Sequence, residues 1–234
     1  MNRSPLRRTS RSDTIVWSAG QPWWQRYAVG AAEYLSWEAD AHRIQEWAVL
    51  RIPDLLYTPD YTRALFHADR VFCADHFVGG RWDDAGARRI ADEIQSRHQR
   101  QARLGGQPDR PVDYTVVIEE AALRKVVGDR SIMRTQLDDL VDFAGATAVT
   151  LRVLPETASP QVDTDGGMTI LEFPDPRTAA SMVFAHYPGG VLAEYEPRMV
   201  AQAQRRFDAV LAAALPEPDT TQFIEQLATE LYPN

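Results

Sequence analysis

The chain has 234 residues, of which 44% are apolar and 25% are charged, and its formal net charge at pH 7 is −8. This composition is typical of a globular protein with a sizeable core, no apolar run approaches the roughly 18 residues of a membrane span, and the acidic balance disfavours duplex DNA as a partner. The single cysteine excludes a disulfide within the chain, so we expect a cytoplasmic protein. We expect no association with a membrane.

The first residues form a basic arm that contains Arg3, Arg7, Arg8 and Arg11. No apolar block follows these arginines, so the arm is not a secretory signal. It also lacks apolar periodicity, and we expect residues 1–21 to be disordered.

Helical spacing dominates the first half of the chain. Residues 22–47 place apolar side chains mostly three or four positions apart, which predicts one or two amphipathic helices. Pro59, preceded by Thr58 as a cap, starts another helix, and residues 83–104 form the clearest one. We therefore expect a helical subdomain over residues 22–110.

Short β-rich runs appear among helices after residue 110, and their tight connections indicate an antiparallel sheet. We predict an α+β fold, with a helical N-terminal half packed beside a small, mainly antiparallel sheet and its flanking helices. The sheet-plus-helix subdomain, residues 111–234, is expected to form one continuous globular unit with residues 22–110. Strands are predicted at 112–118, 147–155, 168–173, 181–186 and 190–195, and helices at 120–128, from Ser131 to Ala144, from Glu196-Pro197 onward and at 219–231.

Five segments occur in one order along the chain: EADAHRIQEWAVLRIPDLLYTPDYTRAL, RHQRQARL, VVIEEAALRKVVG, MRTQLDDL and VTLRVLP. Together they resemble the C-terminal, antitoxin-like domain of WhiJ-type actinobacterial regulators, over about residues 22–231. In that family a helix-turn-helix precedes the domain. The residues before Trp23 are too few for packed helices that present a recognition helix, so we expect no DNA binding.

The sequence departs from the family at candidate site positions. The family has Gly-Leu-Leu-Gln-Thr at the helix break, where this chain has Asp54, Leu55, Leu56, Tyr57 and Thr58. Relatives carry a glutamate at a strand end where this chain has a histidine at position 186. These differences indicate a different ligand or a different task.

Residues around the break are candidates for ligand binding. Tyr57 and Tyr61 are four apart, and Trp47 precedes them, so their rings could line an apolar site that Asp54 borders. The alternative is a packed helical corner.

Two polar residues on the predicted helix 83–104 add to this candidate site. Arg97 and Gln101 are an i,i+4 pair that could hold a carboxylate or carbonyl group together. An ion pair between Arg97 and Glu93 is the alternative.

Catalytic motifs of the common kinds are missing, among them phosphate-binding, nucleophile-elbow and zinc-binding spacings, and we expect no cofactor and no metal. Glu119 and His186 both end predicted strands and would be the acid/base pair if the chain is an enzyme. A structural role is the alternative for both.

Three functions remain open at this stage. The first is a stand-alone effector domain that binds a small apolar or amphipathic molecule or a partner protein. The second is a cofactor-independent biosynthetic enzyme of the cyclase or isomerase type, built on the same pocket. The third is an antitoxin-like protein-interaction module. The sequence also leaves a homodimer open.

Overall fold

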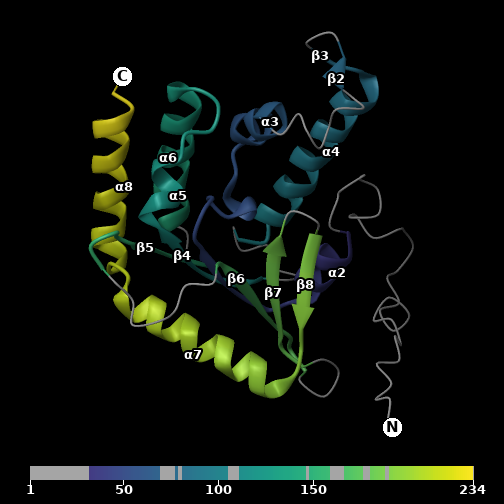
Figure 1. The fold of residues 1–234 in the computed structure, drawn as a ribbon, viewed down its shortest axis with the longest axis vertical. Coiled ribbons are helices and arrows are strands. Elements are labelled where there is room, and N and C mark those ends of the chain that lie inside the picture. Colours follow the sequence, from purple (N-terminus) through teal and green to yellow (C-terminus); the bar gives the residue numbers. More distant parts are fainter. Residues whose placement is uncertain are drawn as a thin grey trace.

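The computed structural model describes residues 32–68, 77–78, 81–104, 111–145, 148–158, 166–175, 180–187 and 190–233. The expected disordered arm, residues 1–21, therefore lies outside the described part (Figure 1). The elements are α2 (Ala32–Asp40), β1 (Arg43–Ala48), η2 (Asp54–Leu56), α3 (Pro59–Ala68), β2 (Phe77–Val78), β3 (Arg81–Trp82), α4 (Asp84–Gln101), β4 (Asp113–Glu119), α5 (Glu120–Arg124), α6 (Arg130–Ala144), β5 (Val149–Leu154), β6 (Met168–Glu172), β7 (Met182–Tyr187), β8 (Gly190–Glu194), α7 (Pro197–Ala213) and α8 (Glu217–Leu231).

Six strands form one sheet in the order β5-β4-β1-β6-β7-β8. The pairs β1/β4 and β4/β5 are parallel, because α3 with α4, and α5 with α6, carry the chain back between them. The pairs β1/β6, β6/β7 and β7/β8 are antiparallel. The α+β class and the mainly antiparallel character of the sheet are confirmed.

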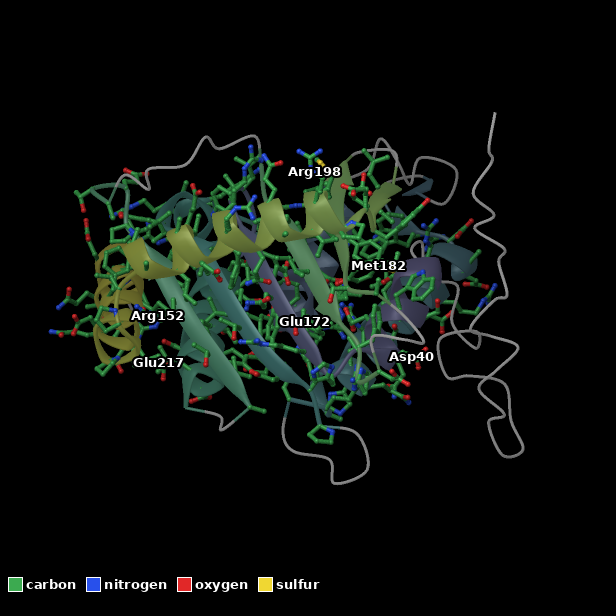
Figure 2. All side chains as sticks on the ribbon, turned by 90° about the horizontal axis from the view of Figure 1, so that it is seen from below. Asp40, Arg152, Glu172, Met182, Arg198 and Glu217 are labelled. Atoms are coloured by element: carbon green, nitrogen blue, oxygen red, sulfur yellow. The ribbon has the colours of Figure 1, made fainter. Side chains whose placement is uncertain are left out.

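Helices cover both faces of this sheet. Helix α7 crosses one face (Figure 2). Its Phe207 and Val210 pack there with Trp47 and Val117. The other face carries the larger core, to which α2, α3, α6 and α8 contribute (Figure 1). We call the first the α7 face and the second the helix face.

The predicted helix over residues 22–47 is wrong at its end, because residues 43–48 form strand β1 in the middle of the sheet. Ile44 lies in the core of the helix face, whereas Trp47 lies in the core of the α7 face. A strand that is buried on both faces loses the alternation of apolar and polar residues by which a strand is recognised. The apolar positions then match helical spacing by coincidence.

The other elements agree with the sequence to within a few residues. The β-branched run predicted at 112–118 forms β4, and the last predicted strand forms β8. One cap differs: Asp129, rather than Ser131, caps α6, and its Oδ1 accepts hydrogen bonds from the backbone N–H groups of Ser131 at 2.9 Å and Ile132 at 3.0 Å.

Candidate functional site

The turn between β1 and α3 is held from the side by α4. Gln101 donates from Nε2 to the carbonyl oxygens of Leu55, at 3.0 Å, and Tyr57, at 3.1 Å. Its side chain therefore satisfies one backbone carbonyl in η2 and one directly after it, neither of which is bonded within a regular helix or sheet. Both hydrogen bonds come from the amide nitrogen of Gln101, and a ligand-binding role for this residue stays a prediction.

The same turn is held from below by α6. Gln136 is fully buried; its Nε2 donates to the carbonyl of Leu56 at 2.8 Å, and its Oε1 accepts the N–H of Thr58 at 2.9 Å. One amide thus replaces both partners that a neighbouring strand would supply to this backbone. The turn is a rigid corner fixed between two helices.

The two predicted tyrosines meet at this corner. Their ring centroids are 4.8 Å apart with an interplanar angle of 43°, and the guanidinium of Arg97 lies 5.1 Å from the centroid of Tyr57. Arg97 also donates to the hydroxyl of Thr62 at 3.0 Å. Arg97 also contacts the carbonyl oxygen of Glu93 at 3.5 Å and Oδ2 of Asp54 at 3.8 Å.

The hydroxyl of Tyr61 is completely buried and has no hydrogen-bond partner in the part of the chain that the structure describes. Burial raises the pKa of Tyr61 to about 12. A buried donor without an acceptor costs about 1–3 kcal/mol of folding free energy. Buried polar groups in native proteins are nearly always hydrogen-bonded, so this unpartnered hydroxyl makes the corner a candidate binding site.

A buried ionic network lies beside the corner. Arg100 donates to Glu38 from Nε at 2.7 Å and from Nη2 at 2.6 Å, and to Asp54 from Nη1 at 2.8 Å and from Nη2 at 3.0 Å. Burial lowers the pKa of Arg100, but the two carboxylates outweigh it and raise that pKa well above its usual range. The side chain of Asp54 is 46% exposed, so the network reaches solvent there.

A further acid, Glu46, lies next to this network on the helix face of β1. Glu46 accepts a hydrogen bond from the hydroxyl of Tyr114 at 2.7 Å, its only hydrogen bond with the described residues. Burial, then the nearby charge of Asp54, raises the pKa of Glu46 to about 8. The group is therefore mostly protonated at neutral pH and can donate as well as accept a proton.

Trp47 does not join the corner, contrary to its predicted place in the binding site. Its side chain lies on the α7 face, and its Nε1 donates to Oε1 of Glu119 at 3.0 Å. Burial raises the pKa of Glu119, and this hydrogen bond partly opposes the rise. Neighbours on a strand point to opposite faces, which explains why Glu46 and Trp47 serve different sites.

Glu119 and His186 come from strands that are not adjacent. Glu119 ends β4, and the backbone of His186 belongs to β7, with β1 and β6 between them. Three strand spacings separate the two backbones by about 14 Å. The side chain of His186 lies outside the described part, and an acid/base role for either residue stays a prediction.

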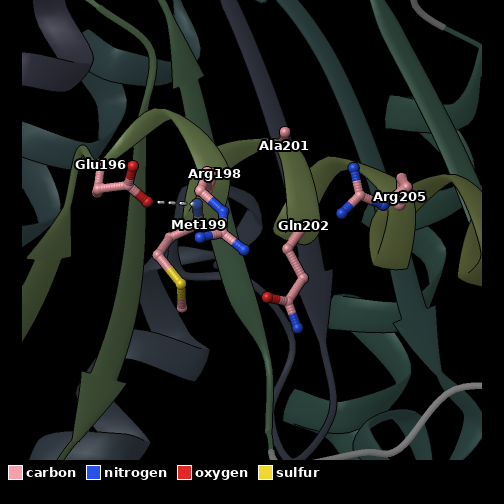
Figure 3. Close-up of a pocket in the computed structure, with 6 residues that line it drawn as sticks. All are labelled: Glu196, Arg198, Met199, Ala201, Gln202 and Arg205. Carbon is pink, nitrogen blue, oxygen red and sulfur yellow. Dashed lines mark hydrogen bonds between the residues drawn. The ribbon is translucent and has the colours of Figure 1, made fainter.

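A hollow of about 540 Å³ opens at the start of α7 (Figure 3). All its lining residues are exposed, and the carboxylate of Glu196 accepts the N–H of Met199 at 3.2 Å as the helix cap. It contains no aromatic ring and no buried polar group, so it offers less recognition chemistry than the corner. The lining residues are Glu196, Arg198, Met199, Ala201, Gln202 and Arg205.

Sequence reasoning brought Asp54, Tyr57, Tyr61, Arg97 and Gln101 to one place, and the structure has them together at the corner.

The same reasoning missed Glu38, Glu46, Arg100 and Tyr114. The signal for Arg100 was its position three residues after Arg97, on the same side of α4. Glu46 becomes a candidate site residue only if residues 43–48 are assigned as a strand.

Comparison with known proteins assigns the chain to a family. No curated protein matches the chain significantly. No helix within the described ranges is both long and apolar enough to cross a membrane. The profile of the family described as Domain of unknown function (DUF5753) matches residues 31–226, which include the corner, the ionic network and the whole sheet. The chain belongs to this family.

Proposed function

We propose that this chain is an effector domain of the kind found in WhiJ-type regulators, acting in the cytoplasm, and that it binds a small amphipathic molecule at the corner between β1 and α3. The five sequence segments that resemble those regulators all fall within or next to the matched region, residues 31–226, which supports the relationship.

One observation carries the proposal: a pair of rings adjoins both a charged network and an unpartnered buried hydroxyl. Tyr57 and Tyr61 provide an apolar wall, whereas Asp54 in the same turn and Arg100 on α4 provide charge. Small-molecule sites combine these two features, since apolar area provides affinity and a few polar groups fix orientation. Packing alone explains the rings, but it does not explain the unpartnered hydroxyl of Tyr61.

Thermal unfolding with single-chain amphiphiles tests the proposal. Octanoate, octylamine and 1-octanol share one apolar chain and differ in headgroup, so a site of any polarity is sampled. We expect at least one of them to raise the melting temperature saturably, since a ligand that binds only the folded state stabilises it. The variant Tyr57→Leu, which keeps apolar bulk but loses the ring, should lower that shift. A melting temperature unmoved by all three probes would count against a small-molecule site.

A second function, a cofactor-independent cyclase or isomerase, is favoured by Glu46. This acid is mostly buried, has a pKa of about 8 and accepts a hydrogen bond from Tyr114. A group of that pKa can transfer a proton in either direction near neutral pH. Turnover of a bound molecule by the wild type, lost in Glu46→Gln with binding retained, would favour the enzyme over the effector domain.

A further inference from the structure

The six-stranded sheet has two edges, and they differ in how their backbone groups are satisfied. At the β5 edge, the N–H of Val153 donates to Oγ1 of Thr220 at 3.1 Å, and its carbonyl accepts the N–H of Leu215 at 2.8 Å. Helix α8 packs against the same strand (Figure 1). The connection between α7 and α8 therefore closes this edge, which is one way in which native sheets avoid pairing with other chains.

The β8 edge has no such cover in the part of the chain that the structure describes. Strand β8 pairs with β7 on one side, and no described residue beyond β7 bonds to its backbone. Its sequence, GVLAE, contains no lysine, arginine or proline, the residues that commonly block an open edge. The outer N–H and C=O groups of β8 are thus open to a further strand.

Exposed apolar side chains accompany this open edge. Leu192 in the middle of β8 is 62% exposed, and Tyr195 after the strand and Met199 in the first turn of α7 are exposed as well. They are three of the five large apolar side chains that are most exposed among the described residues. We call these three residues and the outer edge of β8 the β8 patch. Exposed apolar groups that gather in one place indicate an interaction surface.

Both signs of charge border the β8 patch. Glu194 ends β8 and Glu196 caps α7, whereas Arg198 and Arg205 line the hollow along α7 (Figure 3). Neither arginine forms a hydrogen bond or ion pair with the described residues. In a contact about a two-fold axis, the same surface of both copies takes part, so acids of one copy can pair with arginines of the other. Mixed charge therefore suits a second copy better than a partner of one sign.

We propose that two copies of this chain pair along β8, antiparallel and about a two-fold axis, so that six strands from each copy form one continuous sheet. The backbone groups of both outer edges then find partners, and the apolar side chains of the β8 patch leave water at the same contact. Each copy offers one open edge, because its β5 edge is closed. The assembly therefore ends at two copies and does not extend into a filament.

Sedimentation velocity of the full chain over about 1–100 μM tests this inference, because a reversible dimer forms as the concentration rises. We expect a dimer and no larger species. Leu192→Lys should raise the dissociation constant of the dimer about 10-fold or more, since the contact would bury a charge beside the paired edges. The variant should keep its fold, because Leu192 is largely exposed in the single chain, and circular dichroism checks this.

Leu50→Lys and Val126→Lys are matched controls. These side chains are 70% and 59% exposed, and they follow β1 and α5, away from the β8 patch in sequence. Both variants should form the dimer with the wild-type dissociation constant. Equal weakening by Leu192→Lys and by either control would overturn the β8 pairing. A chain that stays monomeric throughout the range, which would leave the edge to a different partner, or assemblies larger than two would also overturn it.

Hydrogen exchange locates the contact without any substitution. The backbone amides of residues 190–195 should exchange more slowly at high than at low protein concentration, since pairing supplies acceptors to the outer edge. Those of β5, whose edge is already closed, should exchange at one rate at both concentrations. A dimer in which the exchange of β8 is independent of concentration would place the contact elsewhere and overturn the inference. The proposed ligand site at the corner is tested separately, by its own probes.

Discussion

Arg100 and Glu38 form two hydrogen bonds, at 2.7 and 2.6 Å, across 62 residues of sequence, and their side chains are only 4% and 3% exposed. This pair joins α4 to α2 beneath the corner that carries the candidate site. Two charges withdrawn from water stay favourable only while each is fully paired. The pair therefore fixes where α2 lies against α4.

Replacement of Arg100 by Met should destabilise the fold by about 3–5 kcal/mol, because Glu38 would remain buried without its cation. Urea denaturation followed by far-ultraviolet circular dichroism measures the change. Arg63→Met is the matched control: its pair with Asp60, at 2.6 Å, is exposed and should contribute less than about 1 kcal/mol. Equal losses in the two variants would contradict the view that burial makes the Arg100 pair critical.

Stability should fall as pH rises through the range in which Glu46 titrates. The pKa of Glu46 is about 8 in the folded protein, raised by burial and Asp54, against about 4.3 in an unfolded chain. The folded state then binds more protons than the unfolded state between these values. The contribution of Glu46 is thus fully present below about pH 4.3 and is lost as pH rises through about 8.

Glu46→Gln removes this dependence while the amide oxygen can still accept from Tyr114. Urea denaturation at pH 5, 6.5 and 8 should show the variant gaining stability relative to the wild type as pH rises. Glu225→Gln, which replaces an exposed acid on α8, should run parallel to the wild type. If Glu46→Gln also runs parallel, Glu46 does not change its protonation state in this range.

Gln136→Leu should destabilise the fold by about 2–4 kcal/mol, because it leaves the carbonyl of Leu56 and the N–H of Thr58 buried without partners. Gln101→Leu removes two hydrogen bonds from the same turn, but its side chain is only partly buried, so water can replace it at a smaller cost. Chemical denaturation of the two variants compares them directly. A larger loss for Gln101→Leu would mean that α4, not α6, is the main support of the turn.

Tyr61→Phe should leave stability unchanged or raise it by about 1 kcal/mol in the absence of ligand, because it deletes a buried donor that has no acceptor. Tyr114→Phe should have the opposite effect, since the Tyr114 hydroxyl donates to Glu46 at 2.7 Å. Melting temperatures of both variants test the pair of expectations. A marked destabilisation by Tyr61→Phe would show that its hydroxyl has an acceptor in solution.

Local chemistry was enough to locate most elements and the corner. The β-branched run of β4 and the Thr58-Pro59 start of α3 express preferences of the backbone itself, which neighbours along the chain already fix. Tyr57 and Tyr61 were placed together by their closeness in sequence, and their rings do meet, although Tyr57 precedes α3 with an extended backbone. Spacing also placed Arg97 and Gln101 together on α4.

Only the tertiary structure decided which face and which partner each polar residue received. Residues 43–48 became a central strand because neighbours on both sides bury it, and this same burial removed the alternation from its sequence. As a result, the side chains of Trp47 and Glu46 lie on opposite faces of the sheet. Arg100 found Glu38 and Asp54 through the packing of α2, η2 and α4, a contact between distant segments that no local preference encodes.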